Sequence, residues 1–195
     1  GREFGSGGRE VGEKLAAKLG IKLYDKELLQ QAAKDSGFCE EIFENHDEKP
    51  TNSFLYSLVM DTYSVSGYSA APFLDMPLNH KVFLAQFETI KKIAEKESCV
   101  IVGRCADYAL HNHEKCLNVF IHASTEKKVE RIVKLYGETA DKPEKRLADK
   151  DKKRRVNYRY YTDREWGAAQ NYHLCLDSGE FGIEGCADLI ADLAK

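Results

Sequence analysis

The chain begins with a glycine-rich stretch that leads directly into a helical pattern. Four of the first eight residues in GREFGSGGRE are glycine, and apolar residues then recur at helical spacing across 10–19. Glycines let successive N–H groups turn toward one side, and the N-terminus of the helix adds partial positive charge. We therefore predict an anion-binding loop, the glycine loop (residues 1–8), followed by a helix with Gly20 as its C-cap. Such a loop normally follows a β-strand, so we expect either a strand absent from this sequence or another role for the loop.

The glycine loop departs from the usual phosphate-binding pattern G-x-x-x-x-G-K-[ST] at its last two positions. Gly8 is followed by Arg9, which can replace the lysine as a planar cation, and by Glu10 in place of the hydroxyl. A carboxylate there would repel phosphate unless Mg²⁺ lies between them, so Glu10 is the candidate metal ligand. A flexible turn before an acidic helix start is the alternative. The residues expected to hold nucleotide phosphates are Gly5, Ser6, Gly7, Gly8, Arg9 and Glu10.

A dinucleotide-binding loop is a second interpretation of the same glycines. The pattern G-x-G-x-x-G would need glycines at positions 5, 7 and 10, and position 10 is Glu10. Asp25 does follow the next predicted strand at a suitable distance to hold a ribose hydroxyl. Asp25 can equally be an ordinary turn residue at a strand end.

Strand and helix patterns alternate along the rest of the chain. Strands are predicted at 21–25, 99–102, 117–124 and 172–178, and helices at 80–97, at 182–194 and from Ser124 to Gly137. The residues of this last helix expected to face inward are Val129, Ile132, Val133 and Tyr136. Such alternation is typical of an α/β fold with a parallel sheet, whose ligands bind at the carboxyl ends of the strands.

Polar residues follow the continuous apolar run CVIV. Arg104 comes directly after this strand and could clamp a phosphate group with two hydrogen bonds. Asp107 lies one turn further on and could orient Arg104 or accept a hydrogen bond from a base. The alternative is a structural ion pair at the strand end. Arg104, Asp107 and Asp25 are the candidate acceptor-binding residues.

The stretch DKDKKRRVNYRYYTDREWG mixes basic and aromatic residues. It could be a solvated helix face, a surface for single-stranded nucleic acid, or a lid whose arginines close over phosphates. We favour the lid, because the stretch leads into the last strand at the edge of the sheet that the glycine loop occupies. Arg154, Arg155 and Arg159 are its candidate catalytic residues, together with Arg9.

Composition narrows the class of protein. The 195 residues are 31% charged and 43% hydrophobic with a net charge of −3, so we do not expect nucleic acid as a partner. No apolar run approaches the roughly 20 residues of a membrane span. The six cysteines include no C-x-x-C pair, which predicts reduced thiols in a cytoplasmic protein and no zinc site.

The strings REFGSGGRE, YDKELL, CVIVGRCADY and YRYYTDREWGAAQNYHLCLDSG together resemble the bacterial cytidylate kinase-like family, within the P-loop nucleoside monophosphate kinases. The resemblance covers nearly the whole chain. It implies a three-layer α/β domain with a five-stranded parallel sheet. The implied core comprises 1–35, 81–137 and 172–195, with an inserted acceptor-binding segment at 36–80 and a lid segment at 138–171.

The resemblance also implies an activity, namely transfer of the γ-phosphate of ATP, with Mg²⁺, to a small acceptor such as cytidine or another pyrimidine monophosphate. Two motifs depart from those of cytidylate kinases. Their Gly-Arg-Asp reads Gly103-Arg104-Cys105 here, and of their Arg-Asp-x-x-Asp-x-x-Arg only Asp151-x-x-Arg154 is present. A nucleotide-binding protein that no longer catalyses, acting as a sensor or scaffold, is the alternative.

Overall fold

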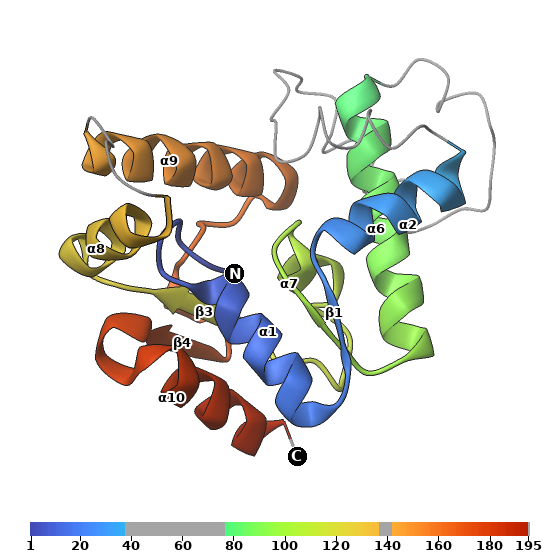
Figure 1. The fold of residues 1–195 in the computed structure, drawn as a ribbon. Helices are drawn as coiled ribbons and strands as arrows, with labels where there is room; N and C mark the ends of the chain where they lie inside the picture. The colour runs from blue at the N-terminus through green and yellow to red at the C-terminus, as the bar shows by residue number, and fades with distance from the viewer. Residues whose placement is uncertain (38–76, 137–141, 195) are drawn as a thin grey trace.

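The computed structural model describes residues 1–37, 77–136 and 142–194, which form a helix-rich mixed α/β fold (Figure 1). In chain order the elements are α1 (Gly8–Leu19), β1 (Lys22–Tyr24), α2 (Lys26–Ser36), α6 (Leu78–Lys96), β2 (Cys99–Ile101), α7 (Ala106–Ala109), β3 (Val119–His122), α8 (Thr125–Tyr136), α9 (Pro143–Thr162), the 3₁₀ turn η1 (Ala169–Asn171), β4 (Leu174–Asp177) and α10 (Ser178–Leu193). Most of the expected acceptor-binding segment lies outside the described residues. The division into core, inserted segment and lid segment stays a prediction.

The strands form small parallel sheets. β1 pairs with β2, and β3 pairs with β4, both in parallel register. The start of the chain runs beside β3, where the Glu3 N–H donates to the Ile121 carbonyl at 3.0 Å and Arg2 forms a parallel bridge with Ile121. The predicted five-stranded sheet is not found among the described residues, because no ladder of hydrogen bonds joins β2 to β3 there.

Local capping signals explain where several helices begin and end. Gly20 adopts the left-handed conformation after α1 and donates to the carbonyls of Ala16 and Ala17, as its predicted C-cap role requires. At α8 the Lys127 N–H donates to the Ser124 hydroxyl at 3.3 Å, which confirms the predicted N-cap.

The prediction of which α8 residues face inward is partly wrong. Ile132 is buried as expected, but Val133 is exposed and Lys128 is buried instead. The 3.6-residue period places Lys128 one turn before Ile132 on the same side of the helix. This side faces the glycine loop and α9, where a carboxylate receives the lysine.

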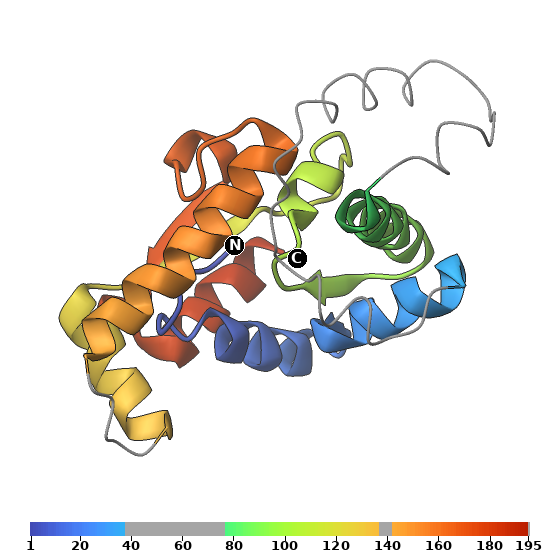
Figure 2. The ribbon, with the colours of Figure 1, turned by 90° about the horizontal axis from the view of Figure 1, so that it is seen from above.

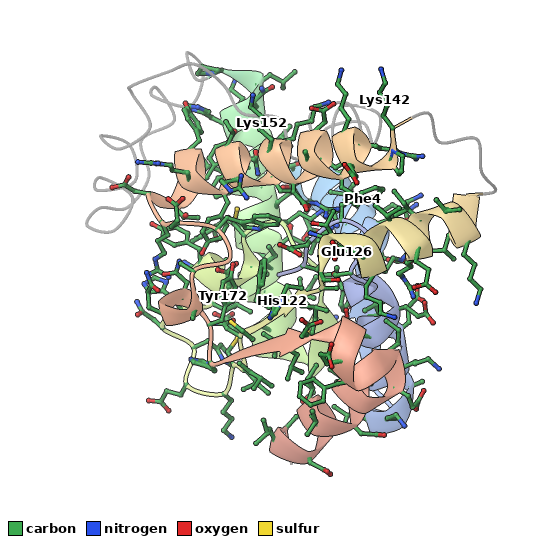
Figure 3. All side chains as sticks on the ribbon, turned by 90° about the vertical axis from the view of Figure 1, so that its left-hand side faces the viewer. Phe4, His122, Glu126, Lys142, Lys152 and Tyr172 are labelled. Atoms are coloured by element: carbon green, nitrogen blue, oxygen red, sulfur yellow. The ribbon has the colours of Figure 1, made fainter. Side chains whose placement is uncertain are left out.

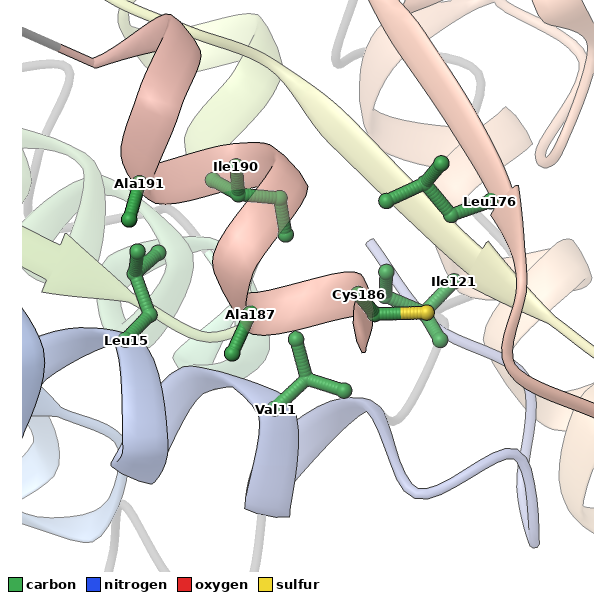
Figure 4. Packing of buried hydrophobic residues seen from close by; sticks show 8 residues of the cluster. All are labelled: Val11, Leu15, Ile121, Leu176, Cys186, Ala187, Ile190 and Ala191. Carbon is green, nitrogen blue, oxygen red and sulfur yellow. The ribbon is translucent and has the colours of Figure 1, made fainter. Parts of the chain in front are cut away.

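One hydrophobic core lies between α1, α10 and the β3–β4 sheet (Figure 4). Val11 and Leu15 of α1 pack against Ala187 and Ile190 of α10, and Leu176 of β4 joins them. The two helices thereby cover one side of this sheet. Figures 1 and 2 show α9 on the other side, crossing over the glycine loop.

A second region of packing surrounds β1 and β2 and holds α9 in place. Leu28 of α2 and Ile90 of α6 are fully buried there. The rings of Phe83 of α6 and Tyr161 of α9 stack with centroids 4.0 Å apart, next to Tyr158 and Cys105. Aromatic packing thus attaches the C-terminal half of α9 to α6 and to the turn after β2.

Two further expectations concern composition. Within the described residues, no helix has the length and apolarity needed to cross a membrane. Five of the six cysteines lie in this part of the chain, and all five are free thiols.

Replacing Leu28 by alanine tests the second core. Leu28 is 0% exposed, whereas Leu193 at the end of α10 is 62% exposed. We expect Leu28→Ala to lower the free energy of unfolding by about 3 kcal/mol and Leu193→Ala by less than about 0.5 kcal/mol. Urea denaturation followed by circular dichroism measures both, and equal losses would contradict the packing described for α2 and α6.

Candidate active site

The glycine loop has the backbone of an anion-binding turn. Gly5 and Gly7 adopt positive φ angles of 84° and 77°, and α1 follows without a side-chain N-cap. The Val11 N–H donates to the Gly7 carbonyl at 3.0 Å, so the N–H groups of the preceding helical residues have no acceptor within the helix. A Cβ on Gly7 would lie 2.3 Å from the Ile183 Cδ1 atom. The loop therefore combines N–H groups that have no acceptor within α1 with a backbone that favours glycine.

Two cations of α8 adjoin the glycine loop. The Lys128 Nζ atom lies 2.8 Å from the Glu3 carboxylate, and the Arg131 guanidinium donates to the Glu10 carboxylate. Cβ atoms added to Gly5 and Gly7 would lie 3.1 Å from Lys128 and 3.0 Å from Arg131. Sequence reasoning missed both cations. Their i, i+3 spacing after the cap of α8 is the only signal that could have indicated them.

The lid segment contacts the glycine loop through Asp151 of α9. The Asp151 carboxylate is buried and accepts the Phe4 N–H at 2.7 Å. Burial raises the pKa of Asp151, although the Phe4 N–H and the positive charge of Arg154 oppose the shift. The guanidinium carbons of Arg146 and Arg154 both lie 5.9 Å from the centre of the Phe4 ring. Helix α9 is therefore held to the loop by one carboxylate and two arginines.

A small cavity of about 20 Å³ lies between the glycine loop, the turn after β2 and α9. It brings together three of the predicted site residues, Arg104, Asp107 and Arg154. Arg154 also donates to the Arg2 carbonyl at 3.4 Å. The lining residues that sequence reasoning did not propose for the site are Gly1, Arg2, Gly103, Cys105, Asn157, Tyr158, Trp166 and Tyr172.

Asp25 joins Arg104 to Arg9. The Arg104 guanidinium donates to the buried Asp25 carboxylate and, at 3.1 Å, to the Val102 carbonyl. The Arg9 Nε atom lies 3.5 Å from the same carboxylate and 3.0 Å from that of Glu13. The strand-end ion pair considered for Arg104 is therefore present, and its partner is another predicted site residue. Arg9 is 52% exposed along its side chain, so these contacts leave it open to solvent.

The turn that presents Arg104 is strained. Gly103, Arg104 and Cys105 all have positive φ, at 78°, 51° and 55°. This region disfavours residues with a Cβ by roughly 1–2 kcal/mol each, and such strain gathers at functional sites. The turn directs Arg104 back toward Asp25 and begins α7, which carries Asp107.

Tyr158 holds Asp107 from α9. Its hydroxyl donates to the Asp107 carboxylate at 2.6 Å. Burial, together with the nearby negative charge of Asp107, raises the pKa of Tyr158 above its usual range. Tyr158 therefore stays a neutral donor that links the turn after β2 to α9.

The other predicted lid arginines, Arg155 and Arg159, do not line the cavity. The Arg155 guanidinium carbon is 5.9 Å from the Trp166 ring, and Arg159 forms an exposed ion pair with Glu165 at 3.7 Å. Two of the three tyrosines of the same stretch, Tyr158 and Tyr161, are buried, and Tyr160 is half-buried. Binding of single-stranded nucleic acid uses exposed aromatic platforms, and these two rings offer none.

No group of three metal-binding side chains occurs among the described residues. The outer face of the first half of α9 is basic and surrounds an open hollow of about 410 Å³. The hollow is lined by Lys142, Lys145, Arg146, Asp149, Lys150 and Lys153.

Breaking the buried pair of Asp25 and Arg104 tests its structural role. Arg104→Met leaves a buried carboxylate with Arg9 as its remaining cation, so we expect the free energy of unfolding to fall by about 3 kcal/mol. Lys22→Met removes the exposed ion pair of Lys22 with Glu97 and should cost less than about 1 kcal/mol. Urea denaturation measures both, and an equal, small loss would show that the buried pair contributes no more than a surface pair.

The raised pKa of Tyr158 predicts a loss of stability in alkali. Above pH 10 this tyrosine ionises in the unfolded chain but stays protonated in the folded protein, so the unfolded state binds fewer protons. The free energy of unfolding should then fall by up to about 1.4 kcal/mol per pH unit for this group. Tyr158→Phe should make the decline between pH 10 and 11.5 shallower in urea titrations. An unchanged slope would contradict the assignment.

Comparisons with known proteins agree with the resemblance in the sequence. The sequence model of the cytidylate kinase-like family matches residues 1–180, which include the glycine loop, the turn after β2 and α9. No curated protein matches the chain. A crystal structure of an uncharacterized protein from Eubacterium ventriosum ATCC 27560 has 28% sequence identity and a TM-score of 0.72, over 99% of this chain and 94% of that one. The protein therefore belongs to the cytidylate kinase-like family.

Proposed function

We propose that the protein transfers the γ-phosphate of ATP to a small acceptor such as cytidine monophosphate or another pyrimidine monophosphate. One observation carries the proposal: Arg2, Arg104 and Arg154, from three different segments, line the same cavity. Phosphoryl transfer depends mainly on positioning the two substrates and neutralising their charge. Cations that converge from the loop, the turn after β2 and the lid segment suit both tasks.

The ATP phosphates would bind between Gly5 and Arg9, at the end of the glycine loop and the start of α1. Ser6, Gly7 and Gly8 complete the turn. Unpaired N–H groups at the start of α1 and the cations Lys128 and Arg131 support this assignment. In the described structure the carboxylates of Glu3 and Glu10 bond to these cations. We infer that phosphate oxygens replace these carboxylates when ATP binds.

Mg²⁺ would accompany the nucleotide. This ion usually keeps phosphates and waters as most of its ligands and takes only one or two carboxylates from the protein. Glu10 fits the role, because it lies in the first turn of α1 beside the loop and its side chain is partly exposed. The ion would supply charge neutralisation at the phosphoryl oxygens.

The acceptor would bind beside Asp25, Arg104 and Asp107, after the strained turn. Arg154 is the lid arginine that we propose to neutralise the transferring phosphoryl group, because it already lines the cavity. Arg155 and Arg159 would reach the phosphates only after they move, since neither lines the cavity and they contact Trp166 and Glu165 in the described structure.

A nucleotide-binding protein without turnover is the second candidate. Three ion pairs favour it, since Arg9 contacts Glu13 and Asp25, and Glu10 contacts Arg131. Both residues that replace the usual lysine and hydroxyl therefore already have protein partners. In this case the loop would bind ATP as a sensor or scaffold.

A coupled assay of ADP release, run with ATP, Mg²⁺ and a panel of nucleoside monophosphates, separates the candidates. We expect one pyrimidine monophosphate to stimulate ADP release well above the rate with ATP alone. ATP binding by calorimetry without stimulation by any acceptor would instead support the second candidate. Absence of ATP binding would contradict both.

Variants of the same protein assign the roles. Arg9→Ala should weaken ATP binding at least about 10-fold, because a cation next to the phosphates is lost. Arg154→Ala should lower kcat by about 100-fold with little change in ATP affinity. Lys18→Ala is the matched control, since Lys18 lies at the far end of α1 and pairs with Glu184 and Asp188. Equal loss of ATP binding from Arg9→Ala and Arg154→Ala would contradict the lid assignment.

A further inference from the structure

The buried hydroxyl of Tyr172 makes no hydrogen bond of normal geometry among the described residues, although the Gly167 backbone and the Tyr158 hydroxyl lie near it. Its side chain is only 7% exposed, and it lies between η1 and β4 (Figure 3). Buried polar groups in folded proteins almost always have a partner, because leaving one unpaired destabilises the fold. We therefore expect this hydroxyl to hydrogen-bond with an atom that does not belong to the chain.

The hydroxyl belongs to a residue that lines the cavity between the glycine loop, the turn after β2 and α9. A volume of about 20 Å³ admits one group the size of a water molecule, which is also the size of a single phosphate oxygen. The cavity wall carries three guanidinium groups, those of Arg2, Arg104 and Arg154, and one carboxylate, that of Asp107. The charges therefore favour a ligand oxygen that is itself negative.

We propose that the Tyr172 hydroxyl donates a hydrogen bond to a phosphate oxygen of the acceptor nucleotide, which makes Tyr172 a substrate-binding residue. This assignment rests on the proposed function, because the acceptor is a nucleoside monophosphate only if that proposal holds. The hydroxyl would be the neutral donor of an anion subsite, beside the three arginines that line the cavity with it.

The surroundings of Tyr172 suit a fixed donor. Its ring packs against Phe120 of β3, with centroids 4.9 Å apart, so the hydroxyl has a defined direction. Burial and the nearby charge of Asp107 raise the pKa of Tyr172, and this effect exceeds the opposing effect of the nearby Gly167 backbone and Tyr158 hydroxyl, so the group stays protonated. A donor that is already oriented loses little freedom when the ligand arrives.

Tyr158 lines the same cavity, but its hydroxyl already has a hydrogen-bond partner. Its hydroxyl already donates to Asp107, so it positions that carboxylate and has no proton left for a ligand. We therefore expect opposite effects from removing the two hydroxyl groups. Removing the Tyr158 hydroxyl should weaken the fold, whereas removing the Tyr172 hydroxyl should weaken ligand binding alone.

The experiment compares Tyr172→Phe with the wild-type protein by titration with cytidine monophosphate, cytidine and inorganic phosphate. The chain has one tryptophan, and Trp166 lines the cavity, so its fluorescence can report binding, with calorimetry as the second readout. We expect cytidine monophosphate and phosphate, but not cytidine, to bind the wild-type protein. Tyr172→Phe should weaken both at least about 10-fold, since it loses a hydrogen bond to a charged group.

Two control variants separate binding from folding. Tyr24→Phe removes a hydroxyl that donates to Glu97 away from the cavity, and it should leave binding unchanged. In urea denaturation without ligand, Tyr172→Phe should be as stable as the wild-type protein or more stable, and Tyr158→Phe less stable. A loss of stability in Tyr172→Phe similar to that of Tyr158→Phe would show a structural role and overturn the proposal.

The remaining outcomes are also decisive. Unchanged affinity of Tyr172→Phe for cytidine monophosphate, or no binding of any probe to the wild-type protein by either readout, overturns the assignment. Binding that depends on Tyr172, found together with an absence of acceptor-stimulated ADP release, would refute phosphoryl transfer while the anion subsite stands. ADP release with an unchanged KM for the acceptor in Tyr172→Phe would refute the subsite alone.

Discussion

The carboxylate of Asp151 is the contact on which the arrangement of the site depends. It accepts the Phe4 N–H at 2.7 Å and lies 3.9 Å from the Lys128 Nζ atom and 3.7 Å from the Arg154 guanidinium. One buried anion thereby joins the glycine loop to α8 and α9. Buried charges are stable in proteins when they are paired and hydrogen-bonded, and Asp151 has both kinds of partner. Helix α9 is thereby held over a loop whose backbone suits an anion.

The other carboxylates of the site are likewise paired with cations of the protein. Glu3, Glu10 and Asp25 each contact a cation that could otherwise face a phosphate. The net charge of the chain is −3, so the positive character of the site is a local property created by placement. Exchange of protein carboxylates for substrate phosphates would then conserve the charge balance while it changes which segments are held together. Catalysis and nucleotide sensing would both use this exchange, and they would differ in whether the acceptor is also aligned.

Local features of the sequence predicted the elements well. The apolar stripe of α1, the caps Gly20 and Ser124, and the alternation in β1 act over a few residues, so a short window contains their cause. The five-stranded sheet was wrong for the described residues, because strand pairing depends on neighbours far apart in the chain. The prediction that Val133 faces inward was wrong for a related reason. Lys128 lies on the buried side of α8 because the carboxylates of Glu3 in the glycine loop and Asp151 in α9 are there to pair with it.

The sequence by itself determined the glycine turn, the acidic and basic residues at the strand ends, and the family to which the chain belongs. Spacing along one segment was sufficient for these. Only the tertiary structure decided which charges meet: Asp25 lies against Arg104, and Arg154 reaches the cavity while Arg159 does not. It also placed Tyr172 in the cavity wall, with an unpaired hydroxyl that no sequence pattern indicates. The physical reason is that ion pairs and cavities form between segments separated by dozens of residues, where the packing of helices on sheets sets the distances.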